Sequence, residues 1–120
     1  MTIQELVAAF NMKYGHPVNP LPIMLHHQVA LERLQLIQEE LTELTEAMRI
    51  RSIVSLADAL GDLAYVVYGT AVAYGLDLDP IIREIHRSNM TKEIGEFKPV
   101  KGLNYEQPDM GAEVWRQGYK

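Results

Sequence analysis

The sequence predicts an all-α fold. Apolar residues recur at intervals of three and four along most of residues 1–94, which is the spacing of one face of a helix. Helix start and stop signals divide this pattern into four helices, and the alternation of a β-strand is nearly absent. A chain of 120 residues is expected to form one domain. We therefore predict a four-helix bundle over residues 1–94, with residues 95–120 as an irregular C-terminal arm of the same domain.

The first predicted helix begins at a capping pattern and ends before a connector. Thr2 and Glu5 match Thr-x-x-Glu, in which each side chain pairs with a backbone N–H at the helix start. Apolar residues follow at helical spacing, and Tyr14 and Gly15 mark the predicted end. Residues 16–22, with the sequence HPVNPLP, contain three prolines and cannot be helical throughout.

Two long helices are predicted next. One begins near His26 and ends near Arg49, and the other begins near Ser52 and ends at Tyr74, before Gly75. The second of these is apolar on almost every side, which is typical of a buried helix. The apolar stripe of the first consists of Ala30, Leu34, Ile37, Leu41, Leu44 and Met48.

A fourth helix and the arm complete the chain. Asp79 is predicted to cap this helix, with Pro80 as its first residue, and the helix is expected to end near Glu93. After Gly95 the helical pattern gives way to glycines, prolines and isolated aromatic residues. We expect a short hairpin or a turn of helix within this arm.

The overall composition argues against nucleic acid and membrane partners. A net charge of −5 argues against a nucleic-acid partner, which would favour clustered lysines and arginines. The uncharged apolar run of residues 63–76 is too short to span a bilayer, and the N-terminus lacks the basic segment of a signal peptide. We expect a cytoplasmic protein with no membrane partner. A hydrophobic content of 48% indicates association between subunits.

Acidic residues gather on the second predicted helix. Glu39, Glu40 and Glu43 lie on the flank of its apolar stripe rather than opposite it, whereas Glu46 faces solvent. The simpler reading is a solvated helix face, and the alternative is a cage for hard cations. Leu36 lies within the same arc as the three acids, and a purely solvated face would not usually include it.

The third predicted helix carries two acids in an otherwise uncharged segment. Asp58 and Asp62 are four residues apart and therefore lie on the same side of the helix. A buried carboxylate requires a positive partner. A salt bridge to Arg33 or Arg51 is the simpler reading. A divalent cation shared with the glutamates explains the pattern better, because both helices carry several acids and few bases.

The type of ligand indicates which metal is expected. Carboxylate oxygens without other donors suit Mg²⁺, Mn²⁺ or Ca²⁺. The chain has no cysteine, and no glutamate is followed by histidine three positions later, as a di-iron bundle would require. The residues by themselves leave these three ions open.

Two segments resemble those of a known family. The sequence EELTE, residues 39–43, is similar to the E-E-x-x-E signature of the MazG-like all-α nucleotide pyrophosphohydrolases, and DALGDLAYVVYG, residues 58–69, resembles their E-x-x-D segment. The likeness covers roughly residues 31–92. It implies a helical enzyme that uses Mg²⁺, with Mn²⁺ as the alternative, and that cleaves nucleotides between the α- and β-phosphates, giving a monophosphate and pyrophosphate. It also implies a homodimer or a dimer of dimers, in which dimerisation completes the bundle.

The resemblance implies roles for the acids. Glu39 matches the leading glutamate and is expected to act in catalysis, by orienting a water molecule or by holding a further ion. The glutamate of E-x-x-D falls at Ala59, which cannot bind a metal, and we expect the adjacent Asp58 to replace it. The remaining metal ligands implied by the resemblance are Glu40, Glu43 and Asp62.

Substrate contacts are expected from the C-terminal third of the chain. The sequence SNMTK, residues 88–92, resembles the segment with which the family contacts its nucleotide, through Asn89 and Lys92 on one helix face. In the arm, Lys101 and Tyr105 are expected to close over the phosphates.

The expected activity is Mg²⁺-dependent hydrolysis of nucleoside triphosphates to monophosphate and pyrophosphate, with a house-cleaning role on deoxynucleotides. Two alternatives remain open. One is hydrolysis of phosphoribosyl-ATP, which belongs to the same superfamily. The other is a non-catalytic helical interaction protein whose acids are only solvated.

Overall fold

The computed structural model describes residues 1–119, and its regular structure is helical. It contains five helices and no strand within these residues, which confirms the predicted all-α class. The chain forms two compact units, Met1–Leu76 and Asp77–Lys120. The first unit contains α1 (Ile3–Lys13), α2 (His27–Ile50) and α3 (Ile53–Tyr74), and the second contains α4 (Leu78–Asn89) and α5 (Met110–Arg116).

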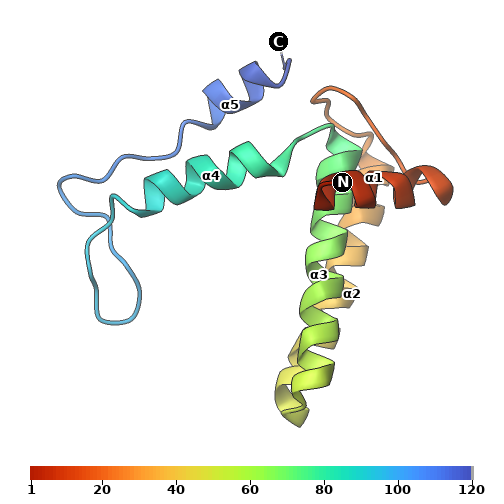
Figure 1. Cartoon of the computed structure of the whole chain (residues 1–120), viewed down its shortest axis with the longest axis horizontal. Helices are drawn as coiled ribbons and strands as arrows, with labels where there is room; N and C mark the ends of the chain where they lie inside the picture. Colours follow the sequence, from red (N-terminus) through yellow and green to blue (C-terminus); the bar gives the residue numbers. More distant parts are fainter. Residues whose placement is uncertain (120) are drawn as a thin grey trace. The chain divides into compact units, whose positions relative to one another are not determined.

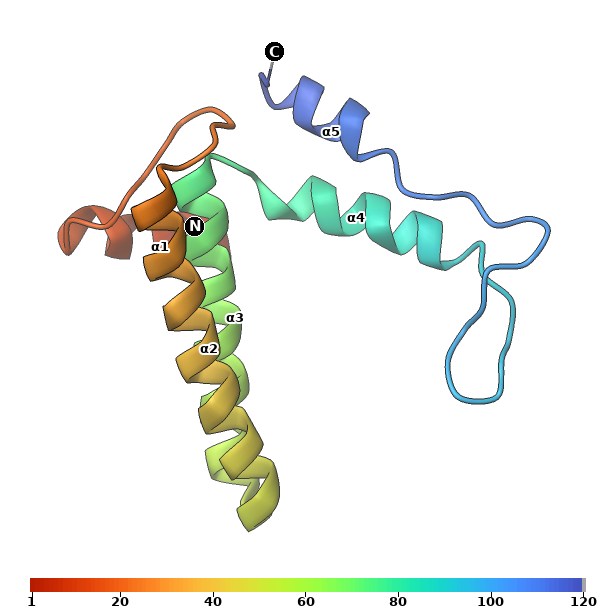
Figure 2. The same cartoon turned by 180° about the vertical axis from the view of Figure 1, so that it is seen from behind.

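In the first unit, α2 and α3 lie side by side along their length, and α1 crosses them near the end of α3 (Figures 1 and 2). The predicted cap is confirmed at α1, where the Thr2 hydroxyl accepts the Glu5 backbone N–H at 3.1 Å and donates to the Glu5 carboxylate at 3.2 Å. Ser52 caps α3 in the same way through the Ser55 N–H. Between α2 and α3, Arg51 adopts a left-handed conformation with φ 58°. Local signals therefore position the two long helices as a tight hairpin.

The proline-rich connector packs on the C-terminal end of α3. Asn19 donates its side-chain amide to the Ala73 carbonyl at 2.6 Å, and the Ile23 N–H donates to the Tyr74 carbonyl at 3.0 Å. Gly75 ends α3 with φ 71°, as predicted, and a Cβ at this position would overlap the Leu21 carbonyl oxygen. These bonds hold the start of α2 close to the end of α3.

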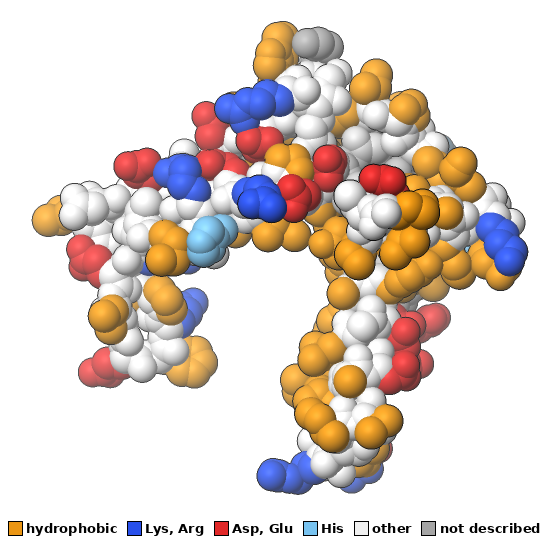
Figure 3. Space-filling model, viewed as in Figure 1, with side chains coloured by type: hydrophobic (Ala, Val, Ile, Leu, Met, Phe, Trp, Pro, Cys, Tyr) orange, Lys and Arg blue, Asp and Glu red, His pale blue; other side chains and the backbone are white. Residues whose placement is uncertain are grey.

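The prediction that α3 is buried is wrong for the single chain. Its fully buried residues are few, whereas Ile53 and Val54 are 76% and 77% exposed. The reason is that α1 and α2 cover only part of the helix. Figure 3 shows hydrophobic side chains exposed along the long helices. The buried residues of α3 are Ala59, Gly69, Ala71, Val72 and Ala73.

The length of α3 bears on the sequence-based argument that no segment is long enough to span a membrane. The helix has 22 residues, and its most apolar window has a mean hydropathy of 1.2. By length and composition alone the helix could cross a membrane, whereas the uncharged run of residues 63–76, which overlaps only its C-terminal half, is too short to do so. Core helices of soluble proteins meet the same criterion.

The second unit differs from the prediction at both ends of α4. Its cap is Asp77, which accepts the Asp79 N–H at 3.2 Å, so the helix begins before Asp79. Pro80 then falls in the first turn, where backbone N–H groups have no partner within the helix and proline is tolerated. The helix ends at Asn89 rather than near Glu93.

The arm contains both elements that the sequence indicated. Glu93 and Val100 exchange two backbone hydrogen bonds, of 2.8 and 2.9 Å, and form an isolated antiparallel bridge. The turn of helix is α5. It is tied to α4 by Glu84, whose carboxylate binds Arg87 and the Asp109 N–H, and these bonds lower the pKa of Glu84 to about 2.

Candidate metal centre

Three carboxylates of the first unit converge at the packing surface of α2 and α3. One oxygen from each of Glu40, Glu43 and Asp62 lies within 4.8 Å of the others. Glu40 and Glu43 are three residues apart and therefore share a face of α2, while Asp62 comes from α3. The structure thus brings together the three acids that the family resemblance marked as ligands.

The acid trio, Glu40, Glu43 and Asp62, is electrostatically unsatisfied without a cation. Glu40 is half-buried, and its Oε2 atom has no hydrogen-bond partner among the described residues. Burial raises the pKa of Glu40 above its ordinary value of 4.5, and the carboxyl groups of Glu43, Asp62 and Glu39 raise it further. A divalent cation would supply the missing partner and offset the repulsion, so the donor set fits a hard metal ion.

The remaining predicted acids lie around this trio. Glu39 is near enough to Glu40 to contribute to the rise in its pKa. Asp58 is exposed and is not a member of the trio. Its neighbour Ala59 packs against Leu44 and Ala47 in the apolar core. At the position of the missing family glutamate, Ala59 therefore contributes to the core. The role of Asp58 as a metal ligand stays a prediction.

In the part of the chain that it describes, the structure does not contain the salt bridges that would explain the two aspartates of α3 more simply. Within residues 1–119, neither Arg33 nor Arg51 forms an ion pair with Asp58 or Asp62. Glu46 does form one, with Arg49 at 2.6 Å, on the exposed side of α2. The prediction that Glu46 faces solvent is confirmed.

A cavity of about 350 Å³ adjoins the trio and was not predicted from the sequence. Glu40 and Asp62 form part of its lining. Its other lining residues come from α1, the connector, α2 and α3, and they include Phe10, His16, Arg33 and Tyr65. No local sequence pattern connects these residues, because four separate segments supply them.

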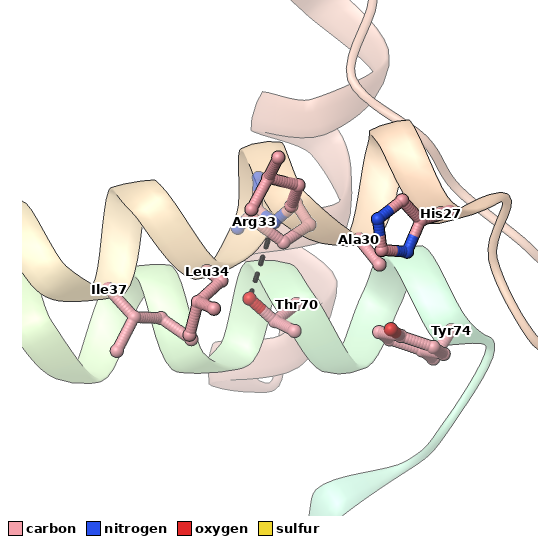
Figure 4. A pocket seen from close by; sticks show the side chains of 8 residues that line it. His27, Ala30, Arg33, Leu34, Ile37, Thr70 and Tyr74 are labelled. Carbon is pink, nitrogen blue, oxygen red and sulfur yellow. Dashed lines mark hydrogen bonds between the residues drawn. The ribbon is translucent and has the colours of Figure 1, made fainter.

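Arg33 is the polar centre of the first unit. It is only 5% exposed, and its Nε donates to the Thr70 hydroxyl at 3.2 Å while Nη2 donates to the Val66 carbonyl at 3.1 Å. It also lines a second cavity, of about 360 Å³, between α2 and α3 (Figure 4). The other residues drawn and labelled around that cavity are His27, Ala30, Leu34, Ile37, Thr70 and Tyr74.

The predicted substrate residues lie in the second unit. Asn89 is the last residue of α4, so the expectation that Lys92 shares a helix face with it is wrong. The helix stops there because side chains of the following turn bind the arm: the Thr91 hydroxyl accepts the Glu106 N–H at 2.8 Å. Lys101 lies over the Tyr105 ring at 5.1 Å. The substrate roles of Asn89, Lys92, Lys101 and Tyr105 stay predictions.

Comparison with known proteins gives a family match and a relative. Residues 4–89 match the phosphoribosyl-ATP pyrophosphohydrolase family. A protein of Acanthamoeba polyphaga mimivirus that carries the name "uncharacterized protein" is 36% identical over 85 residues, which are 65% of this chain. The chain spans about a third of that relative's length, 33%. The family match includes the acid trio and the lining of the adjoining cavity, whereas Lys92, Lys101 and Tyr105 lie beyond it.

Proposed function

The chain belongs to the phosphoribosyl-ATP pyrophosphohydrolase family, and we propose that it is a Mg²⁺-dependent nucleoside triphosphate pyrophosphohydrolase. The product pair would be a nucleoside monophosphate and pyrophosphate. The observation that carries this proposal is the acid trio, whose oxygens converge within 4.8 Å and include an atom without a hydrogen-bond partner. Such a donor set binds a hard divalent ion and would place it beside phosphate oxygens.

The residues of the chain supply the positioning that phosphoanhydride hydrolysis requires. Glu40, Glu43 and Asp62 would hold the metal. When bound, Mg²⁺ neutralises charge on the phosphate oxygens and lowers the pKa of a coordinated water molecule. Glu39, next to this group, accepts the proton of the attacking water. One P–O bond of the α–β bridge breaks as the bond to the water oxygen forms, and the bridging oxygen leaves with one of the two products.

Dimerisation is part of this proposal. The long helices expose large apolar side chains, including Leu34, Leu41 and Met48 on α2 and Ile53 and Val54 on α3. Large apolar side chains exposed in this number along two helices favour an association site. We infer that a second copy of the chain covers it, in a homodimer or a dimer of dimers, as the family resemblance implies.

Two other functions remain to be separated from this one. The family match by itself favours phosphoribosyl-ATP as the substrate. A non-catalytic helical protein would leave the acid trio without a reason to converge. Purified protein should therefore be incubated with Mg²⁺ and each nucleoside triphosphate, each deoxynucleoside triphosphate or phosphoribosyl-ATP.

The assay must measure monophosphate, pyrophosphate and orthophosphate separately. We expect monophosphate and pyrophosphate in equal amounts from at least one nucleoside triphosphate. Hydrolysis of phosphoribosyl-ATP alone would replace the proposed substrate while keeping the chemistry. Failure to hydrolyse any of these compounds would favour the non-catalytic protein.

A further inference from the structure

The cavity beside the acid trio has the lining of a site for an aromatic ligand. The ring of Phe10 lies edge-on to those of His16 and Tyr65, with centroids 5.9 and 5.4 Å away. Glu40 and Asp62 line the same cavity, of about 350 Å³. Small-molecule sites are typically of this size, with mainly apolar walls and a few polar groups. In a nucleotide the base is linked to the phosphates through the sugar. Phosphates bound at the trio would therefore bring the base to an adjoining site.

Arg33 presents a buried positive charge to this cavity. Its hydrogen-bond partners at Val66 and Thr70 are neutral, and its Nη1 lies 3.4 Å from the Nδ1 atom of His16. Within residues 1–119 no carboxylate forms an ion pair with it. A guanidinium has five N–H donors, and these three contacts engage three of them. A buried charge with spare donors is costly unless a ligand supplies acceptors.

The surroundings of Arg33 hold it in place. A Cβ at Gly69 would lie 2.6 Å from Nη2, so glycine allows the guanidinium to approach α3 closely. Beside it, the buried Asn11 donates to the Pro17 carbonyl at 3.1 Å and the Gly69 carbonyl at 3.2 Å. These bonds fix α1 and the connector, which carry Phe10 and His16, against α3. The cavity wall is therefore preorganised around the guanidinium.

We propose that this cavity binds the base of the substrate nucleotide and that Arg33 recognises carbonyl oxygens on that base. The proposal rests on the proposed function and extends it to a substrate class, namely nucleotides whose base carries carbonyl groups. Guanidinium N–H groups donate to carbonyl oxygens, which uracil, thymine and guanine present and adenine does not. The aromatic rings supply the stacking surface that any base requires.

The decisive variant is Arg33→Gln, with Arg49→Gln as its matched control. Arg49 is on the same helix, is 70% exposed and lies outside the cavity. Hydrogen bonds to a charged group are typically worth about ten- to a hundredfold in affinity. We expect Arg33→Gln to lower kcat/KM for uridine and guanosine triphosphates by that factor, and for adenosine triphosphate by less than about threefold. Arg49→Gln should leave all three values unchanged.

A binding measurement separates the base from the phosphates. Calorimetry with uridine monophosphate and with inorganic tripolyphosphate should show weaker nucleotide binding in Arg33→Gln and unchanged tripolyphosphate binding. An equal loss for both ligands would assign Arg33 to the phosphates and overturn the base site. Unchanged binding of both would make Arg33 a purely structural residue and overturn it as well.

Two further variants keep the test decisive if Arg33→Gln does not fold. Gly69→Ala displaces the guanidinium and keeps its charge, and Tyr65→Leu removes a partly exposed wall of the cavity. Gly69→Ala should reduce the preference for carbonyl-bearing bases, and Tyr65→Leu should weaken all bases alike. If the wild-type protein releases no pyrophosphate, the proposed function fails. If it does and neither variant changes nucleotide binding, only the base site fails.

Discussion

Among the acids of the candidate site, Glu40 is the one whose charged carboxylate destabilises the folded protein most clearly. Its carboxyl group is half-buried, faces two other acids and has an oxygen without a hydrogen-bond partner among the described residues. Because its pKa is raised in the folded state, folding favours its protonated form. The metal-free protein should therefore lose stability as the pH rises above about 4.5, the ordinary pKa of this group.

A substitution of Glu40 tests whether its charged carboxylate destabilises the metal-free protein. Glu40→Gln removes the ionisable group at nearly constant volume. At pH 7 without metal, we expect it to raise the melting temperature by a few degrees, and below pH 4 the two proteins should melt alike. With Mg²⁺ the order should reverse, because only the wild type gains the bound ion. A variant that melts below the metal-free wild type at pH 7 would contradict the electrostatic account.

Asp58 and Asp62 allow a comparison on one helix. Mg²⁺ at about one hundred times its Kd should stabilise the wild type by about 2.7 kcal/mol, or roughly 10 °C in melting temperature. Asp62→Asn should remove most of this rise. Asp58 lies outside the trio, but if it takes the place of the missing family glutamate, as predicted, Asp58→Asn should remove a comparable part of the rise. A full rise in Asp58→Asn would contradict that prediction and leave the metal with the trio alone.

Single residues also show what sequence could reveal about the site. The acid trio could be predicted because its spacing on α2 is local and because Asp62 stands out in an apolar helix. The cavity could not, because Phe10, His16 and Arg33 meet only after three segments have packed. In the sequence, Arg33 is only a single basic residue six positions before Glu39. Nothing in that pattern indicates that its side chain is buried.

At the scale of elements, the helix ends decide the geometry. A signal within three residues of the helix start predicted the cap at Thr2 correctly, and the predicted start of α3 near Ser52 agrees with the cap found there. The predicted end of α4 was wrong because the true end depends on two hydrogen bonds with Glu106, which lies far along the chain. The Ser88 hydroxyl donates to the Glu106 carbonyl, and the Glu106 N–H donates to the Thr91 hydroxyl. Propensity alone cannot report such contacts.

The end of α3 gives a stability prediction. Gly75 has φ 71°, and a Cβ there would overlap the Leu21 carbonyl, so Gly75→Ala should cost about 2 kcal/mol or more. Gly61 lies within α3 and has open space around it, so Gly61→Ala should stabilise the helix by about 0.5–1 kcal/mol. Urea denaturation of the two variants measures both effects. Similar changes in the two would mean that the connector does not pack on α3 as described.

At the scale of the whole molecule, the exposed apolar surface requires an explanation. Residues such as Leu41 and Val54, 52% and 77% exposed, are unusual on the long helices of a soluble monomer. A stable dimer buries on the order of 800 Å² per partner, which the faces of two long helices can provide. A dimer of this kind would explain why α3 is exposed in the single chain, contrary to the sequence-based expectation.

Substitutions on that surface test the assembly. Leu41→Glu and Val54→Glu should convert dimers into monomers, as measured by sedimentation equilibrium, because a buried unpaired charge is costly. Glu32→Lys changes an exposed residue on the opposite side of α2 and should leave the mass unchanged. A monomeric wild-type protein at micromolar concentration would contradict the proposed dimer.

The central claim is that the acid trio holds the metal of a nucleotide pyrophosphohydrolase. It is tested most directly by titrating Mg²⁺ into the wild-type protein and Asp62→Asn and measuring pyrophosphate release from a nucleoside triphosphate. We expect no release from the wild type without Mg²⁺ and a saturable rise as Mg²⁺ is added. At each Mg²⁺ concentration that activates the wild type, we expect a loss of at least about a hundredfold in the variant. Pyrophosphate release that is independent of Mg²⁺, or equal in the two proteins, would contradict the claim.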